Sequence, residues 1–215
     1  MMAGIVACGA SPNVAAAFEK KDHIRMVEGE RRTTTVDNPY VIANPSLGLL
    51  NLLGAKADNL LRQDQMEIGP LFPGGVQMST RQVPTCNALF LYCDVDASAR
   101  VVGSAYSLRD AIKTAGADVA VVASEISQDV LVGRGFAQAM GERNDWPANI
   151  VITLNRNGDS FGRFFNSLFS QMRTGISMPM AWVSLAPQGP QQPKDIPGTI
   201  ALMEAGHIAF GPRRG

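Results

Sequence analysis

Three short, mainly apolar runs constrain the fold of this chain more than any other feature. They span residues 88–93, 119–123 and 149–154. Apolar runs of this length without alternation are typical of strands that are covered on both faces. Helical patterns at residues 104–115 and 127–143 separate the three runs. Strands that alternate with helices predict right-handed crossovers and a mainly parallel sheet between two helical layers.

The clearest helical pattern follows the third apolar run. Its large apolar side chains recur three or four residues apart, which predicts one wide apolar face. They are Phe161, Phe164, Phe165, Leu168, Phe169 and Met172. Gly175 follows, where a helix is expected to end. We expect this helix to pack on the sheet and to contribute much of the core.

The remaining segments give the predicted fold its boundaries. The fold class is α/β, with three layers, a mixed and mainly parallel sheet flanked by helices, and a C-terminal hairpin, in a single domain over residues 1–215. We predict a strand at residues 4–8 in the same sheet, a leucine-rich helix from Ser46 to Leu61, a long loop near residues 64–87, a strand or short helix at residues 180–185, and the hairpin at residues 199–203 and 207–210.

Composition narrows the classes of partner. The 19 basic and 19 acidic residues give a net charge of +0, which argues against nucleic acid. No apolar stretch reaches the ~18 residues of a membrane span. The three cysteines, without a Cys-x-x-Cys pair, predict reduced thiols and a cytoplasmic protein. Charged residues make up only 18% of the chain, so we expect a protein partner or a homo-oligomer, with Ile208 or Phe210 near the contact.

Ligands of open α/β sheets bind beyond the carboxyl ends of the strands. That rule selects four segments, residues 9–13, 94–98, 124–127 and 155–159. Within them, Asp94 and Asp96 follow a buried strand at positions i and i+2. Two carboxylates so placed can hold Mg²⁺, and one can act as a nucleophile toward phosphate. The alternative is that both carboxylates cap a turn at the end of the strand.

An apolar strand ending in Asp-x-Asp resembles the first motif of haloacid-dehalogenase-type phosphatases. The resemblance implies a second strand ending in Ser or Thr, which residues 119–124 match with Ser124. It also implies later acidic residues after a further strand, which Asp159 matches. Asp94, Asp96 and Ser124 would then be catalytic, and Asp94, Asp96 and Asp159 would bind Mg²⁺. The Lys that this family requires between its second and third motifs is missing, because Lys194 is the only Lys after Ser124.

A second resemblance covers residues 88–185. The strand–helix–strand order, the aromatic helix and the turn from Gly175 to Trp182 are similar to the C-terminal half of caspase-like CHAT domains. That family uses a His followed by Gly, and a later Cys at the end of a strand. Here His23 precedes an Ile, and His207 lies after every cysteine. The resemblance therefore implies a non-catalytic relative.

Two functions follow from these features. The first is a non-catalytic or catalytically degenerate α/β module that acts by protein binding or assembly. The second is a Mg²⁺-dependent phosphotransferase or hydrolase that uses Asp94 and Asp96. The enzyme requires a third acidic group and a base to converge on Asp94.

Overall fold

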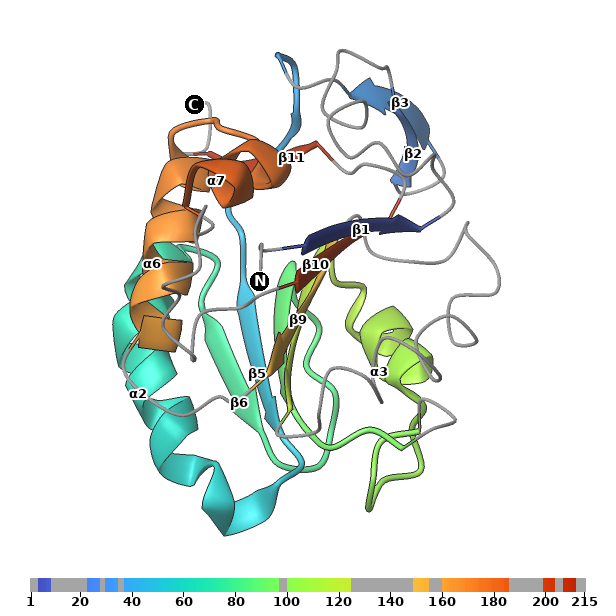
Figure 1. Cartoon of the computed structure of the whole chain (residues 1–215), viewed down its shortest axis with the longest axis vertical. Helices are drawn as coiled ribbons and strands as arrows, with labels where there is room; N and C mark the ends of the chain where they lie inside the picture. Colours follow the sequence, from blue (N-terminus) through green and yellow to red (C-terminus); the bar gives the residue numbers. More distant parts are fainter. Residues whose placement is uncertain are drawn as a thin grey trace.

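The computed structural model describes the backbone of residues 4–8, 23–27, 30–34, 37–96, 100–124, 149–154, 160–185, 199–203 and 207–211. Its main feature is a sheet of seven strands in the order β1-β10-β9-β8-β7-β5-β6 (Figure 1). These strands are β1 (Gly4–Cys8), β5 (Leu47–Asn51), β6 (Val76–Ser79), β7 (Ala88–Tyr92), β8 (Val119–Ser124), β9 (Asn149–Leu154) and β10 (Thr199–Met203). The five strands from β6 to β9 run parallel, and β10 is antiparallel to β9.

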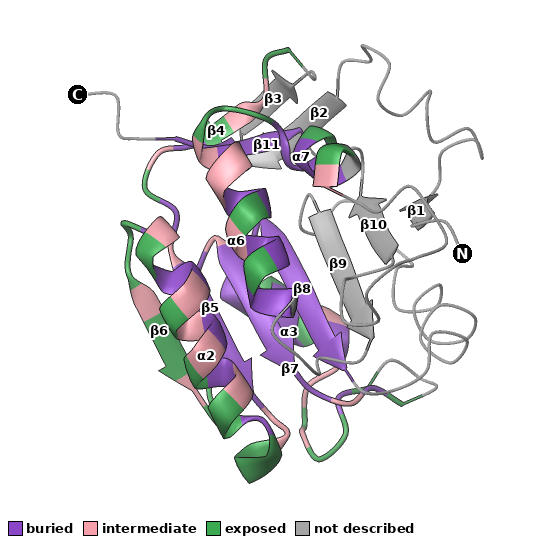
Figure 2. Cartoon of the chain, turned by 60° about the vertical axis from the view of Figure 1, so that its left-hand side comes forward, coloured by how far each residue is buried: buried purple, intermediate pink, exposed green. Residues whose placement is uncertain are grey.

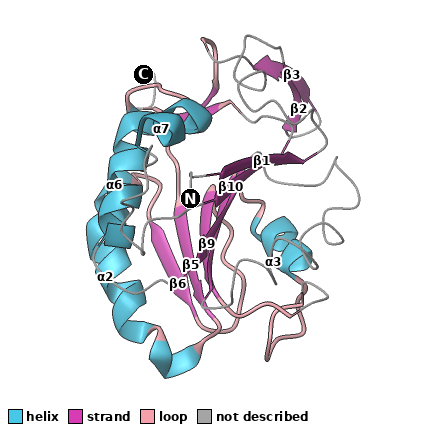
Figure 3. Ribbon diagram, viewed as in Figure 1, coloured by secondary structure: helices cyan, strands magenta, loops and turns pink. Residues whose placement is uncertain are grey.

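Helices cover both faces of this sheet (Figure 3). One face carries α2 (Asp58–Ile68), α6 (Ser160–Arg173) and α7 (Met178–Leu185), and the other carries α3 (Leu108–Ala115). Two 3-10 turns, η1 (Gly54–Lys56) and η2 (Gly69–Leu71), flank α2. The predicted fold class, a three-layer α/β protein with a mixed, mainly parallel sheet, is confirmed.

Two small sheets lie apart from the large one. They are formed by β2 (His23–Val27) with β3 (Glu30–Thr34), and by β4 (Tyr40–Ile42) with β11 (Ile208–Phe210). The two strands predicted for the C-terminal hairpin are therefore present, but they do not pair with each other. Instead, β10 pairs with β9 and β1, whereas β11 runs parallel to β4.

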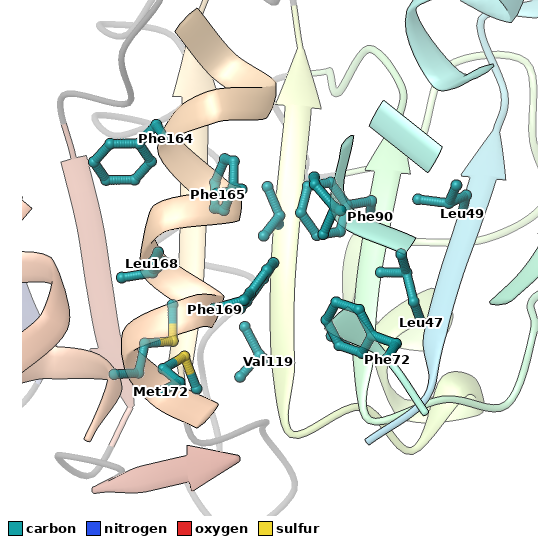
Figure 4. Close-up of a cluster of buried hydrophobic side chains, with 14 of the residues drawn as sticks. Leu47, Leu49, Phe72, Phe90, Val119, Phe164, Phe165, Leu168, Phe169 and Met172 are labelled. Atoms are coloured by element: carbon teal, nitrogen blue, oxygen red, sulfur yellow. The ribbon is translucent and has the colours of Figure 1, made fainter. Parts of the chain in front are cut away.

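The aromatic face of α6 fills the larger core. Phe165 and Phe169 pack against Phe90 of β7, with ring centroids 5.1 and 6.0 Å apart (Figure 4). Successive residues of β7 serve opposite faces, because Leu89 and Leu91 pack with α3 while Phe90 packs with α6. The central strands are therefore buried on both sides, as Figure 2 shows for β7 and β8. This is the arrangement that the uninterrupted apolar runs predict.

The helix predicted from Ser46 to Leu61 is wrong in its first half. Residues Leu47–Asn51 form β5, and every residue of the strand is buried between β6 and β7. The helix begins only at Asp58, after the η1 turn. Gly48 fits the strand closely, because an added Cβ there would lie 2.5 Å from the Cys86 Sγ. Burial on both faces outweighs the helical preference of leucine here.

The long loop predicted near residues 64–87 is only partly irregular. The end of α2, the η2 turn and the edge strand β6 all lie inside it. The prolines and glycines of residues 69–75 form η2 and the turn into β6, where Gly75 has a φ of +96°. Residues 127–143 and Asp159 lie outside the described residues.

The structure also corrects the predicted position of a contact surface. Ile208 and Phe210 are 1% and 0% exposed, and both belong to the core beneath α6 and α7. Phe210 packs against Phe72 and Phe169 at 5.6 and 5.7 Å between ring centroids. These side chains are therefore committed to the interior, and neither can lie at a contact with another molecule.

Candidate functional site at the carboxyl edge of the sheet

Three of the four segments selected from the sequence follow parallel strands of the sheet. Because β7, β8 and β9 run parallel, the segments after them begin at the same edge. The strand β1 runs the other way, since it is parallel to β10 and β10 is antiparallel to β9. The carboxyl end of β1, at Cys8, therefore lies at the opposite edge, and residues 9–13 themselves lie outside the described residues. The carboxyl end of β5, at Asn51, belongs to the edge instead.

Asp94 and Asp96 follow β7, in a segment that pairs antiparallel with residues 100–102. Val95 and Val101 form a bridge, and the Val102 N–H donates to the Asp94 carbonyl at 2.9 Å. The exposed Asp96 accepts the Arg100 N–H at its Oδ1, also at 2.9 Å. Asp96 therefore stabilises the turn, as the structural alternative for this residue predicted.

Asp94 differs from Asp96. Its side chain is half-buried, and its Oδ1 atom is buried without a hydrogen-bond partner among the described residues. Ser124 is fully buried at the end of the neighbouring strand β8, and the register pairs Tyr92 with Ala123. Asp94 and Ser124 therefore lie at adjacent strand ends, as the sequence predicted. Asp159, the third acidic residue of the predicted set, lies outside the described residues.

Cys93 separates β7 from Asp94 and is fully buried. Burial, followed by the negative charge of Asp94, raises the pKa of its thiol from the ordinary 9.0 to about 12. A cysteine nucleophile reacts as its thiolate, which requires a low pKa. The thiol therefore stays protonated near neutral pH, and this arrangement does not activate Cys93.

Two further polar groups at this edge were not selected from the sequence. Asn51 donates through Nδ2 to the Asp58 Oδ1 at 2.8 Å and to the Gly54 carbonyl at 2.9 Å. These bonds fix the turn from β5 into α2. The signal in the sequence is an Asn at the end of a buried strand, which sequence reasoning missed because it assigned this segment to a helix.

The second group is a buried carboxyl–phenol pair. The Tyr92 hydroxyl donates to the Asp64 Oδ2 at 2.7 Å, and both residues are 0% exposed. Asp64 comes from α2, and an added Cβ on Gly162 of α6 would lie 3.3 Å from its Oδ1. Asp64 shares the buried face of α2 with Leu61 and Ile68, at a helical spacing. A carboxylate at an apolar position of a helix is the sequence signal that could have found it.

The described residues form no recognisable metal site, and comparison with known proteins does not identify the function of this edge. Within the described part of the chain, no three His, Cys, Asp or Glu residues come together as a metal site would require. Comparison with protein families, with curated proteins and with solved structures finds no significant match. No described helix is both long enough and apolar enough to span a membrane. The fold and the site define the class as a three-layer α/β protein.

Proposed function

We propose that this chain is a catalytically degenerate α/β module that acts by binding or assembly with protein partners. The observation that carries this proposal is how the polar groups at the carboxyl edge are used. Asn51 binds Asp58, Tyr92 binds Asp64, and Asp96 caps its own turn. Side chains that satisfy one another in this way hold loops in place, whereas a catalytic group must reach a substrate.

The proposal extends to the resemblance with caspase-like CHAT domains. That family places a His and a Cys in its catalytic pair. The family's catalytic Cys lies at the end of a strand. At the ends of β7 and β8, this chain carries Asp94 and Ser124 instead. The one cysteine near this edge, Cys93, has a thiol pKa of about 12. These residues support a non-catalytic relative of the family.

We also propose a cytoplasmic location and no nucleic-acid partner. Cys86 and Cys93 are both free thiols in the interior, which suits a reducing compartment. The net charge of +0 supplies no basic surplus for a phosphate backbone.

The experiment combines a turnover assay with thermal unfolding. Purified protein is tested with an aryl phosphate, with and without millimolar Mg²⁺, beside the Asp94→Asn variant. A binding module should show no turnover that depends on Asp94. Hydrolysis that disappears in Asp94→Asn but survives in Asp96→Asn would contradict the proposal.

One observation favours the second candidate function, a Mg²⁺-dependent phosphotransferase or hydrolase. The buried Asp94 Oδ1 has no hydrogen-bond partner in the part of the chain that the structure describes, and a hard cation could supply an interaction there. If Mg²⁺ binds there, it should raise the melting temperature, because a ligand that binds only the folded state stabilises it. At a concentration of ~100 Kd the stabilisation is about 2.7 kcal/mol. The Asp94→Asn variant should lose this rise, and an unchanged melting temperature in the native protein would remove the candidate.

A further inference from the structure

Asp64 is the most deeply buried acidic residue in the described part of the chain. Its exposed fraction is 0%, whereas Asp118, the other described acidic residue that is buried, is 8% exposed. Burial of a carboxyl group costs free energy unless hydrogen bonds compensate for the lost water. The hydrogen bond from the Tyr92 hydroxyl, 2.7 Å long, fixes this carboxyl group in the core between α2 and β7.

The two oxygens of this carboxyl group face different elements. Oδ2 accepts the hydrogen bond from Tyr92 at the end of β7. Oδ1 lies beside the first turn of α6, because an added Cβ on Gly162 would lie 3.3 Å from it. The same Cβ would lie 3.2 Å from the Glu67 Cγ, so a glycine at position 162 lets α6 approach α2 this closely. Asp64 therefore joins the end of a strand to the start of a helix.

The start of α6 favours a carboxylate. The first N–H groups of a helix have no partner within the helix, and the positive end of the helix dipole lies there. The helix α3 supplies its own acidic group, because Asp110 completes the cap with Ser107. The first turn of α6 contains no acidic residue. Asp64 of α2 therefore brings to α6 the negative group that its own first turn lacks.

The strand end at Tyr92 leads directly into the candidate site. Tyr92 belongs to the core beneath α2 and α6, whereas Cys93 and Val95 pack on the α3 side of the sheet. Successive residues lie on opposite faces, so Asp94 lies on the same face as Tyr92. The hydrogen bond of the Tyr92 hydroxyl therefore restrains the segment that carries Asp94.

We propose that Asp64 forms a latch that couples the start of α6 to the strand end that carries Asp94. The latch consists of Asp64, Tyr92 and Gly162. The first turn of α6 and residues 94–96 then open together and not separately. A partner that orders residues 94–96 thereby also orders the start of α6. This inference goes beyond the binding function proposed above, because it holds whichever partner binds.

Native-state hydrogen exchange of the full chain, followed residue by residue by NMR, tests this latch. The amides of Asp96 and Val102 report on the segment after β7, because they donate to the Arg100 and Asp94 carbonyls at 2.9 Å. The Phe164 amide reports on the start of α6, since it closes the first helical turn. In the native protein these three amides should share one opening free energy, as members of one cooperative unit do.

Breaking the latch should accelerate exchange at both ends. Tyr92→Phe removes the hydroxyl, and all three amides should exchange about tenfold faster or more, the factor for loss of a hydrogen bond to a charged group. Asp64→Asn keeps the shape but removes the charge, and it should accelerate the same amides. Tyr106→Phe is the matched control, because Tyr106 packs on the α3 side of the sheet, and it should leave all three unchanged.

Two outcomes would overturn the latch. One is exchange that stays unchanged in Tyr92→Phe, and the other is acceleration at one end of the latch without acceleration at the other. Circular dichroism first confirms that each variant is folded. The measurement needs no binding partner, so it separates failure of the latch from failure of the proposed function.

Discussion

Truncation of Phe165 should destabilise this fold more than most single substitutions. Phe165 is 0% exposed, and its ring lies 5.1 Å from Phe90, 4.9 Å from Phe161, 5.4 Å from Phe164 and 5.8 Å from Phe169. Phe→Ala changes in packed cores cost ~3–5 kcal/mol, through lost transfer energy and the cavity that remains. Aromatic pairs add about 0.5–1.5 kcal/mol beyond burial. With four such neighbours, we expect a loss in the upper half of the range.

Urea denaturation followed by circular dichroism measures this loss. With a slope of about 2–3 kcal/mol per molar urea, the midpoint of Phe165→Ala should fall by roughly 1.3–2.5 M. Phe165→Leu, which keeps most of the volume, should cost less. Met66→Ala is the surface control, because Met66 is 73% exposed and such changes usually stay within about 0.5 kcal/mol. An unchanged midpoint for Phe165→Ala would show that α6 does not pack on this sheet.

Three further substitutions test other parts of the core. Gly48→Ala should cost ~1–3 kcal/mol in urea denaturation, since its Cβ would lie 2.5 Å from the Cys86 Sγ, and an unchanged midpoint would contradict the close fit. Tyr92→Phe removes the hydroxyl that donates to buried Asp64 and should cost about 1–3 kcal/mol, whereas a more stable variant would contradict this role. The raised pKa of Cys93, about 12, predicts that stability falls as pH rises above about 9, because the unfolded chain loses a thiol proton that the folded chain keeps. Cys93→Ala should weaken this alkaline loss relative to the native protein, and an identical pH profile would contradict the assignment.

The sequence predicted those elements whose burial leaves a periodic or continuous pattern. The runs at β7, β8 and β9 are strands, and the aromatic spacing of α6 is a helix with one buried face. The helical pattern predicted at residues 104–115 forms α3 only from Leu108, after the Ser107 cap, and Gly116 ends the helix at a φ of +61°. These features depend on local sequence or on burial alone, so they can be predicted without knowing strand neighbours.

The pairing of strands could not be predicted from the sequence in the same way. The β5 strand contains three leucines and one glycine, a composition that fits a buried helix as well as a central strand. Only its position between β6 and β7 decides between them. The C-terminal strands raised the same difficulty, because strands close in sequence usually pair, while here β11 adds to β4. Long-range pairing leaves no local signal in either segment.

The sequence predicted which strand ends form the candidate site, but not the hydrogen bonds that its side chains make. Adjacent parallel strands bring Asp94 and Ser124 to one edge, which the alternation of strands and helices implies. The hydrogen bond from the Arg100 N–H to Asp96 depends on the backbone path of the turn, which the sequence does not reveal. The Asp64–Tyr92 pair joins residues 28 positions apart, and no motif links them.

The low fraction of charged residues is explained mainly by the large apolar core. A charged fraction of 18% suggested apolar surface for a partner near Phe210, yet that ring is 0% exposed beneath α6. Among the described large apolar residues, the most exposed are Met66 at 73%, Val102 at 52% and Met78 at 50%. Apolar composition alone could not separate a large core from a contact surface, because both remove the same side chains from water.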